Sequence, residues 1–178
     1  MPRIRILIAD DHALVRASLR GLLAAQPDFE IAGEASDGVA AVEACRQLLP
    51  DVALMDASMP GRDGISATSD IREASPNTKV LVLTLHEEEI YVRQALRAGA
   101  AGYALKRSRA DELIAAIRMV HGGAGYVAPS LVRTHTAGHA GGATSARRPL
   151  QRADCAYAAL CTAPKCGECW TPAARRRR

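Results

Sequence analysis

Five polar side chains stand at or just beyond the ends of short apolar runs in this chain of 178 residues. They are Asp10, Asp11, Asp56, Thr84 and Lys106. Three carboxylates in one crevice would repel one another, so a cation must offset them. Mg²⁺ suits such a place, because it takes one or two protein carboxylates together with water and phosphate oxygens. These residue types indicate phosphoryl transfer, with Asp56 as the nucleophile.

The two remaining side chains have properties that complement the acids. The Lys106 ammonium is a movable point charge suited to a phosphoryl oxygen, and the Thr84 hydroxyl can donate to another. Each residue also has an ordinary interpretation, since an Asp can cap a helix or loop, a Thr can be a plain strand residue and a Lys a solvated end. Their joint occurrence at four strand ends favours the phosphoacceptor interpretation.

The elements that must position these residues follow from apolar patterning. Apolar runs predict five strands, over residues 3–9, 29–35, 51–56, 79–84 and 102–106. Helical periodicity predicts five helices, over 13–26, 39–49, 64–74, 87–98 and 108–121. Alternating strands and helices indicate an α/β fold, a doubly wound parallel sheet of flavodoxin-like order 2-1-3-4-5. Its carboxyl edge would collect all five polar side chains.

Residues 1 to about 129 resemble the CheY-like receiver domain of bacterial two-component response regulators, and more specifically the NarL/FixJ family. The matching stretches are 8–12 (Ile-Ala-Asp-Asp-His), 55–61 (Met-Asp-Ala-Ser-Met-Pro-Gly), 63–64 (Asp-Gly), 82–84 (Val-Leu-Thr) and 98–106 (Ala-Gly-Ala-Ala-Gly-Tyr-Ala-Leu-Lys). They are spread over the whole domain and are specific in combination.

The resemblance implies a role for each site residue. Asp56 would accept phosphate from a sensor histidine kinase. Mg²⁺ would be held by Asp10, Asp11, Asp56 and the backbone carbonyl of Ser58. Thr84 and Tyr103 would form a switch, with Thr84 drawn toward the phosphate and the Tyr103 ring turning inward. The plainer alternative for Tyr103 is a half-buried strand aromatic, and His12 and His86 are assigned no role.

The composition changes abruptly after the last predicted helix. Residues 1–131 carry 14 Lys and Arg against 17 Asp and Glu, a net charge of −3, whereas residues 132–178 carry 9 against 2, a net charge of +7. We expect a receiver domain over 1–128 and a basic, largely disordered tail over 129–178. Large aliphatic residues beyond 131 are limited to Val132, Leu150 and Leu160, too few to offset the chain entropy of folding.

Three interpretations of this tail compete. Cys155, Cys161, Cys166 and Cys169 could hold a metal, although their spacing does not give paired knuckles. Arg147-Arg148 and residues 175–178 could form a sequence-independent nucleic-acid arm. The leading hypothesis is a degenerate or out-of-frame remnant of a lost effector module, because no helix-turn-helix pattern is seen.

The expected function is phosphorylation-dependent signalling in a two-component phosphorelay, derived from transcription regulation. One alternative is an intact DNA-binding transcriptional regulator whose tail folds on DNA or metal. Another is a receiver-only phosphate sink, and a homodimer through the receiver is also possible for such a chain. An enzyme that uses an aspartyl nucleophile on external substrates is not expected, because Ser58 stands where a phosphatase needs a second Asp. Only self-catalysed phosphorylation and dephosphorylation of Asp56 are expected.

The beginning of the chain bears on its location. The first apolar run is short and stops at Asp10 and Asp11. It fits neither a signal peptide nor a membrane span. A soluble cytoplasmic protein is therefore expected.

Overall fold

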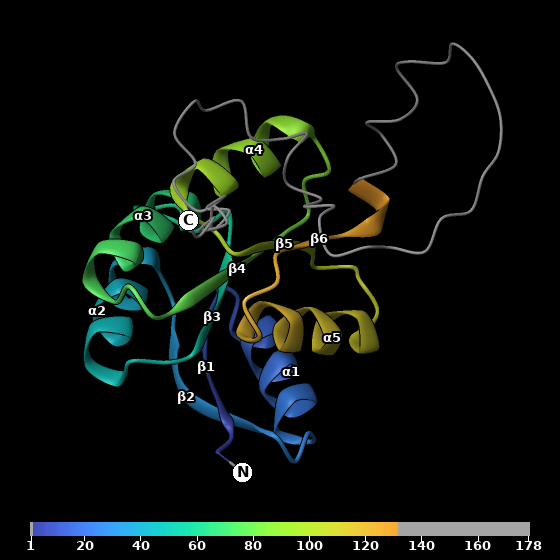
Figure 1. Ribbon diagram of the computed structural model, residues 1–178. Helices are drawn as coiled ribbons and strands as arrows, with labels where there is room; N and C mark the ends of the chain where they lie inside the picture. The colour runs from blue at the N-terminus through green and yellow to red at the C-terminus, as the bar shows by residue number, and fades with distance from the viewer. Residues whose placement is uncertain (1, 132–178) are drawn as a thin grey trace, which may run out of the picture. The chain divides into compact units, whose positions relative to one another are not determined.

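A computed structural model of the chain describes residues 2–131 (Figure 1). The strands are β1 (Ile4–Ala9), β2 (Phe29–Ala35), β3 (Val52–Asp56), β4 (Lys79–Thr84), β5 (Gly102–Leu105) and β6 (Tyr126–Val127). The helices are α1 (Ala13–Ala24), α2 (Gly38–Leu48), α3 (Gly64–Ala74), α4 (Glu89–Ala98) and α5 (Ala110–His121). The tail interpretations concern residues 132–178 and lie outside this described part.

The strands form one parallel sheet in the order β2-β1-β3-β4-β5-β6. The predicted α/β class and the order 2-1-3-4-5 are confirmed. Helices α1 and α5 cover one face of the sheet, and α2, α3 and α4 cover the other (Figure 1). This doubly wound arrangement arises because the chain places β2 on one side of β1 and β3, β4 and β5 on the other. Right-handed crossovers in these two directions put helices on opposite faces of the sheet.

Strand β1 contributes to both cores because its side chains alternate between the two faces. Ile6 and Ile8 belong to the apolar cluster that α1 and α5 complete with Leu23 and Ile117. Leu7 is equally buried and, by the same alternation, faces the layer of α2 and α3. Such two-sided burial explains why the strand reads as a continuous apolar run.

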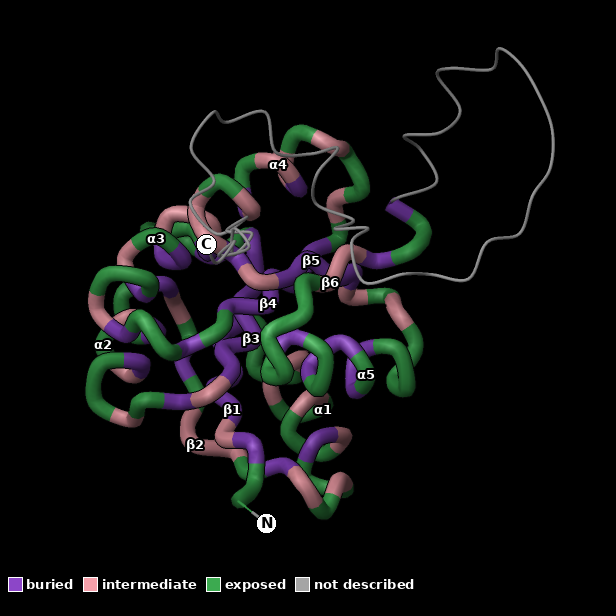
Figure 2. Tube along the Cα trace, viewed as in Figure 1, coloured by how far each residue is buried: buried purple, intermediate pink, exposed green. Residues whose placement is uncertain are grey.

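Strand β3 lies at the centre of the described sheet and is buried along its whole length (Figure 2). Its residues from Val52 to Met55 have no exposed surface, and Asp56 at its end is 2% exposed. Neighbouring strands β1 and β4 pair with it in register on both sides. A strand that is buried along its whole length therefore places Asp56 at the edge of the sheet.

The sixth strand was not predicted. Gly102 pairs with Tyr126 and Tyr103 pairs with Val127, and the Ala128 N–H donates to the Tyr103 carbonyl at 3.0 Å. Leu131 is 2% exposed, so packing continues past residue 128, where the receiver was predicted to end. Two residues are too few to show the alternation by which a strand is recognised.

Several predicted helix ends shift by one or two residues. Helix α1 ends at Ala24 rather than 26, because Pro27 disfavours helical geometry at the residue before it. Helix α4 begins at Glu89 rather than 87 because Glu88 has extended backbone. Helix α5 begins at Ala110 rather than 108, after Arg109, whose N–H donates to the Glu112 carboxylate at 3.3 Å.

No helix within residues 2–131 is long and apolar enough to cross a membrane.

Asp63 caps the start of α3. Its carboxylate accepts the Ser66 backbone N–H and the Ser66 hydroxyl, both at 2.8 Å. Partial burial opposes ionisation, but these hydrogen bonds outweigh it and hold the pKa of Asp63 below its ordinary value. The cap therefore stabilises the folded state most when Asp63 is ionised.

We expect Asp63→Ala to lower the free energy of unfolding by about 1 kcal/mol, the usual cost of losing a cap. Asp63→Asn is the matched control, because it keeps an acceptor oxygen without the charge. Since the folded pKa is lowered, the ionic contribution is present above the unfolded pKa of about 4 and is lost as the pH falls through the folded value. Urea unfolding across this range should show wild type converging on Asp63→Asn in acid. A gap that stays constant with pH would contradict the ionic contribution.

Candidate acidic phosphoryl site

Four of the five predicted site residues meet at the carboxyl edge of the sheet. Asp10 follows β1, Asp56 ends β3 and Lys106 follows β5. The Lys106 ammonium nitrogen lies 2.7 Å from Asp10 Oδ2 and 2.7 Å from Asp56 Oδ2. Asp11 offers a carboxylate oxygen within 4.8 Å of those of Asp10 and Asp56. The sequence-based grouping of the three acids and Lys106 is therefore found in space.

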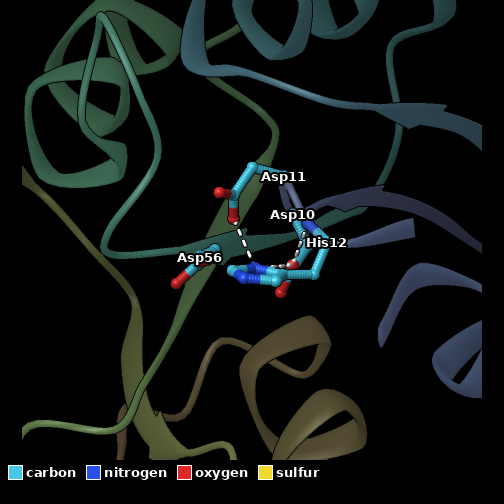
Figure 3. A group of neighbouring side chains, drawn as sticks. All are labelled: Asp10, Asp11, His12 and Asp56. Atoms are coloured by element: carbon cyan, nitrogen blue, oxygen red, sulfur yellow. Dashed lines mark hydrogen bonds and ion pairs between the residues drawn. The ribbon is translucent and has the colours of Figure 1, made fainter. Parts of the chain in front are cut away.

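His12 completes this group from the loop between β1 and α1. Figure 3 shows its ring among the three carboxyl side chains. Its Nδ1 atom lies 2.8 Å from Asp11 Oδ1 and 3.5 Å from Asp10 Oδ1, although the side chain is 68% exposed. No pattern in the sequence indicates a role for His12, and its proximity to the acids is visible only in the structure.

Burial dominates the electrostatics of Asp56. Desolvation raises the pKa of Asp56 above its ordinary value, although the contact with Lys106 and the Ser58 N–H, 3.1 Å from Asp56 Oδ1, both oppose the shift. Burial alone would lower the pKa of Lys106, but its contacts with Asp10 and Asp56 outweigh that effect and raise it. Lys106 therefore stays protonated and stabilises the ionised acids.

The donor set fits a hard divalent cation. Asp10 Oδ2 and Asp11 Oδ1 are buried, and beyond their ion pairs with Lys106 and His12 neither accepts a hydrogen bond within the described residues. Carboxylate oxygens with spare acceptor capacity are the ligands that Mg²⁺ and related ions prefer. The acidic group is thus consistent with the metal site of a receiver domain.

Thr84 and Tyr103 contact the same loop residue. The Thr84 hydroxyl oxygen accepts the His86 N–H at 3.0 Å, and the Tyr103 hydroxyl donates to the His86 carbonyl at 3.4 Å. Tyr103 has no exposed surface, so it is more deeply buried than a half-buried strand aromatic. Burial also raises the pKa of its hydroxyl. The two side chains bracket the loop between β4 and α4.

That loop has further contacts that sequence reasoning did not identify. The His86 ring stacks on Tyr91 with centroids 4.6 Å apart, and Arg107 forms an ion pair with Glu87. A surface hollow of about 440 Å³ lies over the loop, lined by Leu85, His86, Glu87, Glu88 and Arg107. The hollow lies beside Thr84 in the chain and does not include the acidic group.

Gly64 fixes how close α3 comes to the end of β3. A Cβ atom at Gly64 would lie 1.8 Å from the Asp56 carbonyl oxygen and 2.9 Å from Met55 Cγ. The Gly64 N–H donates to the Ala57 carbonyl at 3.1 Å. A glycine is therefore required where the first turn of α3 passes over the peptide group of Asp56.

Ser58 is exposed in the loop that follows Asp56. Its N–H donates to Asp56 Oδ1, which places its peptide group beside the acidic group. The predicted use of its carbonyl as a metal ligand stays a prediction.

Comparisons with known proteins agree with this geometry. Residues 6–118 match the response regulator receiver domain family. The chain is 43% identical over 129 residues to the transcriptional regulatory protein DegU of Brevibacillus brevis, covering 72% of this chain and 55% of that protein. It is 45% identical over 129 residues to the oxygen regulatory protein NreC of Staphylococcus carnosus, covering 72% of this chain and 59% of that one. The chain thus spans little more than half the length of these relatives.

Solved structures give the same assignment. A two-component response regulator of the LuxR family from Aurantimonas superimposes with a TM-score of 0.71 at 34% identity, covering 74% of this chain and 94% of that chain. The receiver domain of the response regulator NarL from Mycobacterium tuberculosis gives a TM-score of 0.67 at 38% identity, covering 69% and 99%. With the fold, the acidic group and the family match in agreement, the chain belongs to the response regulator receiver family.

Proposed function

We propose that Asp56 accepts a phosphoryl group from a sensor histidine kinase in a cytoplasmic two-component pathway. The supporting observation is the position of Asp56, a buried carboxylate that contacts Lys106 through one oxygen and the Ser58 N–H through the other. The family match supports the same role, because a receiver domain is a signal-receiving module rather than an enzyme that acts on external substrates.

The proposed step exchanges one phosphorus bond for another. An Asp56 carboxylate oxygen forms a bond to phosphorus, and the bond between phosphorus and the donor's histidine nitrogen breaks. The result is an acyl phosphate on Asp56 and, once the ring takes up a proton from water, a free neutral imidazole. Lys106 faces Asp56 and can contact a phosphoryl oxygen that carries negative charge in the transition state.

Asp10, Asp11, Asp56 and the Ser58 carbonyl would hold Mg²⁺, which when bound neutralises charge on the phosphoryl oxygens. Lys106 then has two partners in common with the cation, Asp10 and Asp56. A cation that draws on these carboxylates would leave the Lys106 ammonium free to turn toward phosphate.

The switch is proposed to work through Thr84 and the loop that follows β4. The Thr84 hydroxyl oxygen accepts from the His86 N–H, and on phosphorylation its hydrogen would turn to a phosphoryl oxygen on Asp56. Movement of Thr84 would displace His86, whose carbonyl also accepts a hydrogen bond from the Tyr103 hydroxyl. The loop and α4 are then the element whose position reports phosphorylation.

The proposed output is regulation of transcription, the role that the name of DegU gives to that protein. Since this chain spans 55% of DegU, a DNA-binding output remains a proposal about residues beyond the receiver. A receiver that only drains phosphate from a kinase, or acts as a homodimer, would need no such output.

Intact mass before and after treatment with acetyl phosphate and Mg²⁺ tests the proposal. Wild type should gain a single phosphoryl group, and Asp56→Asn should gain none. Asp63→Asn is the matched control, because it removes an exposed acid seven residues further on. It should gain one phosphoryl group, as wild type does. An adduct that persists in Asp56→Asn, or none on folded wild type that binds Mg²⁺, would rule out Asp56 as acceptor.

A further inference from the structure

Arg16 of α1 connects the acidic site to a second group of charges. Its Nη1 atom donates to the Asp10 backbone carbonyl at 2.6 Å. Its Nε atom lies 3.6 Å from Glu34 on β2, and its side chain is 19% exposed. Arg20, one turn later, lies 3.0 Å from the other oxygen of Glu34 but is 58% exposed. Of these two arginines, only Arg16 has a contact with Asp10.

The Asp10 peptide needs such a donor. Asp10 is the first residue after β1, and at 1% exposure it is closed to water. Its N–H donates to the Ala35 carbonyl on β2 at 3.2 Å. A buried carbonyl also requires a partner, because an unpaired one costs free energy comparable to a lost hydrogen bond. Arg16 supplies that partner, so the Asp10 peptide is fixed on both sides.

Glu34 fixes the guanidinium in turn. Its two carboxylate oxygens face one arginine each, 3.6 Å from Arg16 Nε and 3.0 Å from Arg20 Nη1, so the ion pairs restrict both side chains. The result is a continuous set of contacts from β2 through α1 to the turn that carries Asp10 and Asp11.

We propose that Arg16 is a positioning residue for the cation-binding carboxylates, oriented by Glu34. This proposal rests on the proposed function, since it assigns to Arg16 the placement of Asp10 and Asp11 at the Mg²⁺ and phosphoryl site. Partners of this kind orient the direct ligands of a metal, and their loss typically weakens metal affinity about 10- to 100-fold.

Charge and position predict opposite results, which makes the proposal testable. Removing a positive charge near a cation site should by itself tighten cation binding, because repulsion between the two cations is lost. Removing the anchor of the Asp10 peptide should weaken binding, because the carboxylates are no longer held together. Arg16→Met removes both the charge and the anchor, whereas Arg20→Met removes a charge and leaves the Asp10 contact in place.

Mg²⁺ titration calorimetry on the full chain measures the difference. Arg16→Met is expected to bind Mg²⁺ about tenfold more weakly than wild type, and Arg20→Met as tightly as wild type or more tightly. Arg16→Lys should recover part of the loss, because one ammonium can reach Asp10 or Glu34 but lacks the fork that contacts both. Glu34→Gln, which keeps the guanidinium but loosens it, should fall between wild type and Arg16→Met.

Equal Mg²⁺ affinity of Arg16→Met and Arg20→Met would overturn the proposal, as would tighter binding by Arg16→Met. If circular dichroism shows that Arg16→Met does not fold, Arg16→Lys decides by the same criterion, because it keeps the positive charge and alters only the contact with Asp10. Wild type that binds Mg²⁺ but gains no phosphoryl group would refute the role of Asp56 alone. Wild type that binds no Mg²⁺ would refute both the metal site and the positioning role.

Discussion

Gly64→Ala is expected to abolish phosphorylation of the chain and to lower the free energy of unfolding by about 3 kcal/mol, the upper end of the usual cost of overpacking. The added Cβ would lie 1.8 Å from the Asp56 carbonyl oxygen and 2.8 Å from its carbon. Because both atoms belong to the backbone, no rotamer change relieves the contact. Either α3 or the end of β3 must shift, and the latter carries the proposed nucleophile.

Gly21→Ala is the matched control, the same substitution with nothing within 4 Å of the new Cβ. Gly21 lies inside α1, where alanine is favoured over glycine by roughly 1 kcal/mol, so this variant should be more stable than wild type. Urea unfolding and intact mass after acetyl phosphate treatment measure both effects. Wild-type stability and phosphorylation of Gly64→Ala would show that α3 can retreat without moving Asp56.

Lys106→Met is expected to destabilise the fold by about 3 kcal/mol near neutral pH, the lower end of the cost of removing one partner from a buried ion pair. Asp10 and Asp56 are at most 2% exposed and would lose the ammonium that contacts both. Added Mg²⁺ should restore part of the lost stability, because the cation replaces the missing charge.

The pH dependence of this variant identifies the cause. Burial raises the folded pKa of Asp56, so the stability tied to its protonation is complete below the unfolded pKa of about 4. That stability is lost as the pH rises through the folded value, and without Lys106 the folded value is higher still. Lys106→Met should therefore resemble wild type in acid and diverge as the pH rises.

Asp56→Asn provides the control for this charge effect. It should be more stable than wild type at neutral pH, since it removes a buried charge that opposes folding, and Asp56→Asn with Lys106→Met should recover stability relative to Lys106→Met. Urea unfolding at several pH values, with and without Mg²⁺, measures all four proteins. A deficit of Lys106→Met that is the same at every pH would point to lost packing rather than to charge.

The position of the acidic group could be predicted because it depends on topology. Asp10, Asp56, Thr84 and Lys106 each follow or end an apolar run, and a parallel sheet brings such ends to one edge. Residues 52–55, between Asp51 and Asp56, are all apolar, which is typical of a strand covered on both faces. The fold and the meeting of the three acids with Lys106 were therefore accessible from patterning and turn residues, whereas the roles of Ser58 and Tyr103 came from the family resemblance.

What could not be predicted depends on side chains that meet across the fold. The bond from Arg16 to the Asp10 carbonyl requires the angle at which α1 packs on the sheet, and periodicity does not specify that angle. The start of α4 at Glu89 reflects how Thr84 and Tyr103 hold His86, which overrides the helical preference of the acids before it. The pairing of Tyr126 with Gly102 is a long-range contact of a very short segment.

That short segment also protects the β5 edge of the sheet against pairing with another chain. Residues Gly102–Leu105 of β5 are buried throughout, and an apolar strand with an open row of N–H and C=O groups is a template for pairing with another chain. β6 pairs with Gly102 and Tyr103 of that strand and leaves a two-residue edge close to Pro129, to which another strand can add few hydrogen bonds. A fragment that ended before Tyr126 would keep the acidic site, but it would leave β5 as an unpaired edge strand to which another chain could pair.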